Sequence, residues 1–205
     1  MNNALNPFSQ MPKGKIVIFD LEYTCWEGSM ARGWTGENEY CEIVQLGAVK
    51  LDGSKGHLET ASYDALIKPK LNPNLSDYFT DLTGIHQAEL DQNGISFPDA
   101  IHAFSTFIGD DTAQVYSCGG DEKHVYWNCG LHALSCPIDM RLFRDIMPIL
   151  QMALSQGTKP ITSSQLPQML GLGISSQAHN ALADARCIAE AIRVLRKPEM
   201  TILND

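Results

Sequence analysis

Two acidic residues follow an apolar stretch near the start of the chain. Residues 15–19 are mostly β-branched and apolar, and Asp20 and Glu22 come directly after them. Such a stretch predicts a buried central strand over residues 15–22. Side chains two positions apart on a strand share one face, so these carboxylates should lie close together. Close like charges need a proton or cation, and Mg²⁺ or Mn²⁺ suits carboxylate oxygen. The pair alone also fits a capped turn followed by a solvated acid.

A second acidic position lies in a segment with helical periodicity near the end of the chain. Apolar residues recur at helical spacing through residues 180–196, which predicts a helix there. Asp184 interrupts a run of small residues in its first turns, five positions after His179. A carboxylate in such a run should be held at a set position. Histidine changes charge near neutral pH and can take a proton from water, although His179 could also only cap or pack the helix.

Strands come first in the chain, and strands and helices alternate after them. Further strands are expected over residues 42–51, 58–67 and 114–117, with a tight turn at Asp52-Gly53. The expected helices cover residues 97–108, 122–129, 140–154 (interrupted near Pro148) and 165–170, with short helical turns within 72–90 and a polar loop over 26–40. This order predicts an α/β fold with a mixed sheet flanked by helices. We expect one domain over residues 14–198, between flexible tails at 1–13 and 199–205.

The composition is that of an ordinary globular protein of 205 residues, with 44% hydrophobic and 19% charged residues. No apolar run reaches the ~20 residues that a membrane-spanning helix needs. The six cysteines form no CxxC pair and no leader is apparent, so we expect a cytoplasmic protein with reduced thiols. Cys129, His132 and Cys136 lack a second ligand pair, which disfavours zinc. The net charge of −9 argues against broad binding to duplex DNA, but a cation-binding carboxylate cluster could hide a nucleic-acid enzyme in such a sequence.

Taken together, Asp-x-Glu at the first strand, a middle aspartate and His-x4-Asp at the last helix resemble the DEDDh subgroup of the DnaQ-like exonucleases. The resemblance covers roughly residues 15–196. The segments that resemble the Eri/KapD-like branch most closely are residues 19–26, 42–49, 82–85 and 179–186. The resemblance implies an RNase H-like fold, with a three-strand antiparallel meander plus parallel strands flanked by α-helices.

The resemblance also implies a set of site residues. Two divalent cations, Mg²⁺ or Mn²⁺, would be held by four carboxylates, and a histidine would act as general base. The implied ligands are Asp20, Glu22, Asp121 and Asp184, and the implied base is His179. The middle position is ambiguous, because Asp121 is followed by Glu122 and the family usually has Trp where Cys118 stands. Spacing from Ser117 and Gly119 favours Asp121, with Glu122 as the alternative.

The implied activity is 3′→5′ hydrolysis of single-stranded RNA or DNA ends, with release of nucleoside 5′-monophosphates. By resemblance, Leu82 and Thr83 would border the terminal base, and backbone near Tyr23 and Thr24 would meet the 3′ hydroxyl. Trp26, Trp34 and Tyr40 could stack further bases or pack their loop. Cys25 and Trp26 after Glu22 favour the Eri/KapD-like branch and hence, by resemblance, structured or small RNA ends. The alternatives are an inactive nucleic-acid-binding or regulatory module of the same fold, and an unrelated α/β protein whose acids match by accident.

Overall fold

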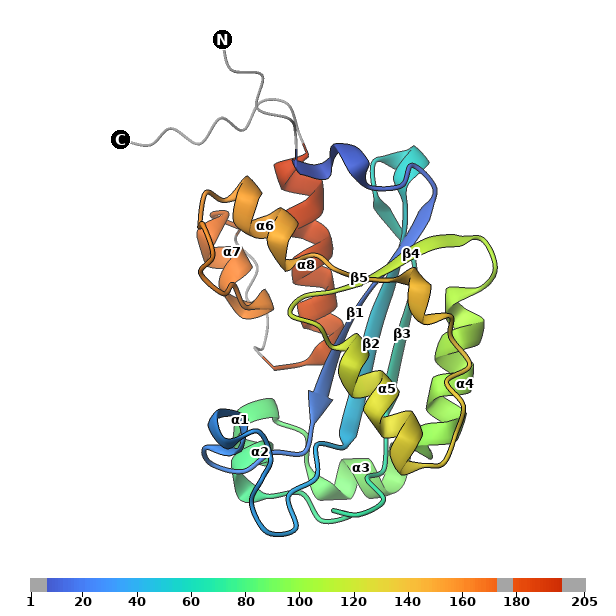
Figure 1. Cartoon of the computed structure of the whole chain (residues 1–205), viewed down its shortest axis with the longest axis vertical. Helices are drawn as coiled ribbons and strands as arrows, with labels where there is room; N and C mark the ends of the chain where they lie inside the picture. Colours follow the sequence, from blue (N-terminus) through green and yellow to red (C-terminus); the bar gives the residue numbers. More distant parts are fainter. Residues whose placement is uncertain (1–6, 173–178, 197–205) are drawn as a thin grey trace.

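A five-stranded mixed sheet forms the centre of the molecule (Figure 1). The computed structural model describes residues 7–172 and 179–196. Within them, β1 pairs antiparallel with β2 and parallel with β4, β2 pairs antiparallel with β3, and β4 pairs parallel with β5. The order across the sheet is β3 (Leu58–Leu66), β2 (Ile43–Asp52), β1 (Lys15–Tyr23), β4 (Thr112–Ser117) and β5 (Phe143–Asp145). The expected meander followed by parallel strands is therefore confirmed.

Helices cover both faces of this sheet. One face carries α6 (Met147–Ala153), α7 (Leu166–Met169) and α8 (Ala181–Leu195), and the other carries α4 (Phe97–Ile108) and α5 (Glu122–Leu131). Three short helices gather beyond the end at which β1 finishes (Figure 1): α1 (Ser29–Arg32), α2 (Asp77–Thr83) and α3 (Gln87–Asn93). The 3₁₀ turns are η1 (Pro7–Gln10), η2 (Gly53–Lys55), η3 (Met140–Leu142) and η4 (Ser163–Gln165). Among the described residues, no helix combines the length and apolarity required to cross a membrane.

Alternation along β1 decides which way its acids point. Ile16 and Ile18 pack in the core beneath α8, whereas Val17 and Phe19 pack in the core beneath α4 and α5. All four side chains are fully buried, as expected for a central strand covered on both faces. The two-residue period therefore turns the next even position, Asp20, toward α8.

The expected helix over residues 140–154 is wrong in its first half. Residues 140–142 form η3, and Phe143–Asp145 pairs in parallel with β4 as the edge strand β5. The helix begins only at Met147, with Pro148 in its first turn. A backbone N–H at that position has no partner within the helix, so a proline there costs no hydrogen bond. Phe143 is 5% exposed and packs against Phe19, so burial against the sheet prevails over the local helical pattern.

The start of the chain also differs from the expected loose tail over residues 1–13. From residue 7 onward it is structured, because Pro7–Gln10 forms η1 and Phe8 and Met11 are buried in the core beneath α8. The expected tight turn at Asp52-Gly53 is longer than two residues, since η2 and a left-handed Gly56 complete the connection.

Candidate active site

Three carboxylates converge between β1 and the first turns of α8. One ligand oxygen from each of Asp20, Glu22 and Asp184 lies within 4.8 Å of the others. Glu22 is 8% exposed and Asp184 is 3% exposed, so little water screens their charges. The sequence predicted these three residues to share one site, although Asp184 lies more than 160 positions after the other two. Their convergence is what the predicted cation site requires.

Burial raises the pKa of every carboxyl in this cluster, and repulsion between the acids adds to the shift at Asp20 and Glu22. Burial, followed by the charges of Asp121 and Glu22, raises the pKa of Asp20 well above its ordinary value. Burial and the nearby Asp184 raise the pKa of Glu22 to about 8. The pKa of Asp184 is also raised by burial, although the Ser163 hydroxyl and His179 oppose the shift. Without a cation, Glu22 therefore retains its proton near neutral pH, and burial disfavours the charged form of the other two carboxyls.

Asp184 is placed by the hydrogen bonds at the start of α8. The side chain of Asn180 accepts from the backbone N–H of Ala183, which caps the helix. His179 has a left-handed backbone with φ of 62°, and its N–H donates to Asp184 Oδ2 at 3.1 Å. A left-handed non-glycine residue carries strain that its surroundings must offset, and such residues gather at functional sites. His179 is thus fixed beside the carboxylate cluster and remains partly exposed.

Gly47 and Gln45 on β2 bring α8 close to β1. Gly47 pairs with Asp20 across the sheet, and a β-carbon at Gly47 would lie 2.0 Å from the amide nitrogen of Leu182. Only glycine permits this approach of helix to strand. Gln45 is 3% exposed, accepts from the backbone N–H of Ala181 at 3.0 Å and donates to Asp64. Neither residue was predicted to support the site, because contact between a strand and a distant helix leaves no local signal in the sequence.

The electrostatic neighbours of Asp121 favour it over Glu122 as the middle acid. Its charge raises the pKa of both Asp20 and Glu22, and its own pKa rises to about 7 through burial and the adjacent Glu122. The carboxylate of Glu122 instead accepts from the Ser117 hydroxyl at 3.2 Å. Asp121 lies outside the 4.8 Å set of three, so it flanks the cluster.

Tyr23 and Thr24 lie in a packed corner beside the cluster. The Tyr23 ring stacks on His124 at 4.6 Å between centroids and meets Trp34 edge-on at 5.4 Å. Thr24 is 3% exposed, and its hydroxyl donates to Tyr40 O and accepts from the backbone N–H of Glu42. These contacts occupy the Thr24 side chain, and its backbone N–H donates to Glu42 O at 2.8 Å, so Thr24 is held within the packed corner.

Leu82 and Thr83 lie at the end of α2. Leu82 is 36% exposed, whereas Thr83 is 2% exposed and lines a cavity of about 470 Å³ together with Gln45 and Asn180. This cavity adjoins the start of α8, because Asn180 is the α8 cap. Leu82 is therefore an exposed leucine and not part of the core.

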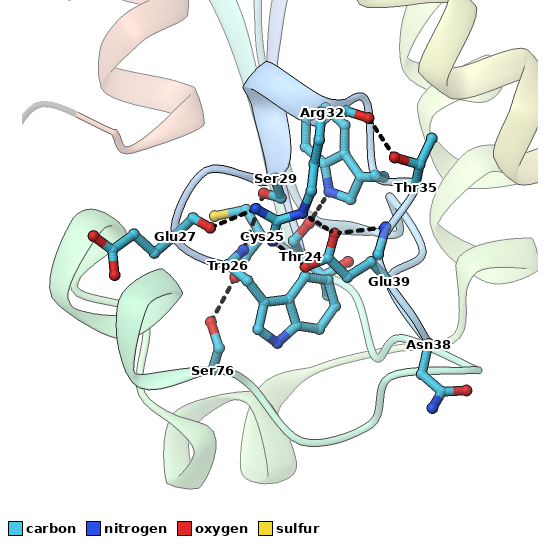
Figure 2. A network of polar contacts seen from close by, with 12 residues as sticks. Thr24, Cys25, Trp26, Glu27, Ser29, Arg32, Thr35, Asn38, Glu39 and Ser76 are labelled. Atoms are coloured by element: carbon cyan, nitrogen blue, oxygen red, sulfur yellow. Dashed lines mark hydrogen bonds and ion pairs between the residues drawn. The ribbon is translucent and has the colours of Figure 1, made fainter.

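The loop between β1 and β2 is held by an internal polar network (Figure 2). Trp34 Nε1 donates to Thr24 O at 2.8 Å, so the indole is fixed against its own loop. The Arg32 guanidinium lies over the loop, donates to Glu27 O at 2.7 Å and forms an ion pair with Glu39. The Ser76 hydroxyl donates to Cys25 O and ties the start of α2 to this loop.

The acidic cluster is a better candidate for a metal site than the group of Cys129, His132 and Cys136. Asp184 Oδ1 is buried and has no hydrogen-bond partner among the described residues, although buried polar oxygens rarely lack one. An oxygen-only donor set suits Mg²⁺ or Mn²⁺. The structure adds no support for zinc at these residues, because Cys129 is buried in the core and the His132 ring stacks on Phe97.

Comparison with known protein families decides the classification. The model of the family RNase_T, described as exonuclease, matches residues 17–192. The chain belongs to the RNase T exonuclease family. The resemblance drawn from the DEDDh motifs is confirmed at this level, since the match spans the first strand and nearly all of α8.

Curated relatives of this RNase T family member include proteins of the Eri type. ERI1 exoribonuclease 2 of Xenopus laevis is 32% identical over 107 residues, which are 52% of this chain and 14% of that protein. The 3′-5′ exonuclease Snipper of Drosophila melanogaster is 32% identical over 108 residues, 53% of this chain and 34% of that protein. ERI1 exoribonuclease 2 of Homo sapiens is 24% identical over 195 residues, 83% of this chain and 27% of that protein. The chain thus spans about a third or less of the length of these relatives.

Solved structures confirm the fold of this RNase T family member. The nuclease domain of 3′hExo, a DEDDh family member bound to rAMP, superposes with a TM-score of 0.71 at 21% identity, over 89% of this chain and 92% of that chain. Exonuclease I of E. coli in complex with a dT13 oligonucleotide gives a TM-score of 0.67 at 14% identity, over 90% of this chain and 41% of that chain. The expected RNase H-like mixed sheet of the DEDDh exonucleases is confirmed.

Proposed function

We propose that this chain is a 3′→5′ exonuclease that hydrolyses the terminal phosphodiester bond of single-stranded RNA or DNA and releases nucleoside 5′-monophosphates. The observation that carries the proposal is the convergence of Asp20, Glu22 and Asp184 within 4.8 Å, with an unpartnered buried oxygen on Asp184. Membership in the RNase T family supports the reaction class. The names of the Eri-type relatives favour RNA as the substrate.

In this proposal the four carboxylates hold two divalent cations. When bound, such a pair makes water a better nucleophile and stabilises the oxygen that leaves. Asp20, Glu22 and Asp184 supply ligand oxygens at the centre of the site, and Asp121 supplies one from the start of α5. Cation binding must displace protons from the cluster, because the pKa of Glu22 is about 8 and that of Asp121 is about 7.

His179 acts as general base in the proposal. Its backbone N–H is fixed on Asp184, so its partly exposed imidazole stays at the edge of the cluster. The neutral ring takes a proton from water as the water attacks phosphorus. The bond from phosphorus to the 3′ oxygen of the preceding nucleotide breaks, and the terminal nucleotide leaves with its 5′-phosphate.

The alternative is an inactive module that binds nucleic acid through the same fold. A module that has lost activity has no need for a complete acid set, yet Asp20, Glu22, Asp121, Asp184 and His179 are all present. The intact set favours the enzyme.

The test uses 5′-labelled single-stranded RNA and DNA oligomers with Mg²⁺, Mn²⁺ or EDTA. Wild-type protein should produce ladders that shorten from the 3′ end and release nucleoside 5′-monophosphates. EDTA and the Asp20→Asn substitution should both abolish the ladders. The relative rates rank RNA against DNA. Absence of cleavage in either metal would favour the inactive module.

A further inference from the structure

The exposed face of α5 carries two aromatic rings. Tyr126 is 64% exposed and Trp127 is 41% exposed, and neither ring packs against another aromatic ring within the described part of the chain. Lys123 and Gly130 share this face at spacings of three and four residues from the rings. The opposite face packs Val125 and Cys129 into the core, so the rings are not needed to hold the helix.

This aromatic face, defined as Lys123, Tyr126, Trp127 and Gly130, begins at the active site. Asp121 directly precedes the first residue of α5. The Lys123 ammonium folds back to the loop before the helix, and lies 3.4 Å from the position that a β-carbon of Gly120 would take. The positively charged Lys123 ammonium therefore lies beside the site. The rings of Tyr126 and Trp127 follow one turn further along the same helix.

We propose that the aromatic face binds the single strand upstream of the scissile bond, with Lys123 meeting a phosphate and Tyr126 and Trp127 stacking on bases. The inference rests on the proposed exonuclease function and adds a path for the substrate. Nucleobases stack on exposed aromatic side chains without regard to sequence, and lysine steers the phosphate backbone. Gly130 lies on this face without a side chain, and nothing lies within 4 Å of where its β-carbon would be, so it leaves room for a base.

The length of α5 sets how far the strand must extend. Trp127 lies six positions after Asp121, which is about 9 Å along the helix at the rise of ~1.5 Å per residue. That distance equals about two to three stacked nucleotides at ~3.4 Å each. A dinucleotide would end before the rings, whereas a strand of four or more nucleotides would reach them.

The test compares kcat/KM for single-stranded substrates of two, four and eight nucleotides. The ratio of octamer to dinucleotide should fall about tenfold in Trp127→Ala and in Tyr126→Ala, in line with the usual contribution of one stacked base. Trp127→Phe should restore most of the ratio, because it keeps a ring. Met152→Ala is the matched control, since Met152 is 67% exposed on α6, on the other face of the sheet. An unchanged ratio in both alanine variants would overturn the proposal.

A binding measurement separates this proposal from the proposed function. Fluorescence anisotropy of a labelled octamer in EDTA, with Asp20→Asn and with Asp20→Asn/Trp127→Ala, reports strand binding without hydrolysis. Weaker binding by about tenfold in the double variant supports the aromatic face even if the wild-type protein cleaves nothing, a result that would contradict only the exonuclease. Equal binding, with a change only in self-association on sedimentation, would make the face a protein contact and overturn the proposal.

Discussion

The backbone of Leu182 lies against the Cα of Gly47, in the space that a side chain would fill. This contact brings the first turn of α8 onto β2, next to the strand that carries Asp20 and Glu22. Asp184 can then approach the two strand acids. The site therefore depends on a residue that carries no functional group.

Gly47→Ala should disable the site by displacing α8. Inserting a methyl group into a closed core typically costs about 1–3 kcal/mol, and backbone on the other side of the contact leaves little room for relief. Misplacing a catalytic group by about 1 Å can reduce the rate roughly 100-fold. The free energy of unfolding measured in urea and the kcat should both fall in Gly47→Ala. Gly14→Ala is the control, because no atom lies within 4 Å of its β-carbon position. Full activity in Gly47→Ala would contradict the role of this contact.

Asp121→Asn and Glu122→Gln should separate the two adjacent acids. We expect a loss of more than roughly 100-fold in kcat for Asp121→Asn, because cation ligands matter at least as much as their supporting contacts. Glu122→Gln should stay within about threefold, since its main contact is with the Ser117 hydroxyl, outside the cluster. The kcat of each variant at saturating Mn²⁺ decides which of the two acids is the cation ligand. The reverse order of effects would assign the site to Glu122.

His179→Ala should separate proton transfer from cation binding. Loss of a general base typically reduces kcat by about 10²–10⁴-fold. The backbone N–H that donates to Asp184 Oδ2 survives this substitution, so Mn²⁺ affinity should remain near that of the wild type. Added imidazole should restore part of the rate in the variant. Loss of Mn²⁺ binding along with activity would show that the residue acts through structure and not as a base.

Without divalent cations, the folded protein should lose stability as the pH rises from about 5 to about 8. Burial raises the pKa of Glu22 from 4.5 to about 8 and that of Asp121 from 3.8 to about 7. In this window the folded chain holds protons that the unfolded chain has released, so a higher pH favours unfolding. Thermal unfolding across this range should show a falling melting temperature that Mg²⁺ or Mn²⁺ restores. Glu22→Gln should flatten the fall, and an equally steep fall in that variant would contradict the assignment.

The sequence predicts the ends of the site better than its middle. Asp20 and Glu22 follow from the two-residue period of a buried strand, and Asp184 from the apolar period of a long helix, because both signals are local. The choice between Asp121 and Glu122 is not local. It depends on the loop before α5, in which Gly119 and Gly120 take left-handed backbones.

Elements that depend on distant partners were not predicted. The edge strand Phe143–Asp145 is three residues long, and only its pairing with β4 and the contact of Phe143 with Phe19 make it a strand. The sequence left open whether Trp34 stacks a base or packs its loop, and its hydrogen bond to Thr24 O favours packing. The sequence therefore identifies residues with suitable chemistry, but tertiary contacts decide which of them face the site.

The central claim is that the acid cluster holds the cations that the reaction needs, and a Mn²⁺ titration monitored by electron paramagnetic resonance tests it most directly. The wild-type protein at about pH 8 should bind about two Mn²⁺ ions per chain. Asp184→Asn should bind fewer ions and release no nucleotides, because it removes a ligand at the centre of the cluster. If Asp184→Asn binds the same number of ions with the same affinity and still shortens strands from the 3′ end, the cluster is not the cation site.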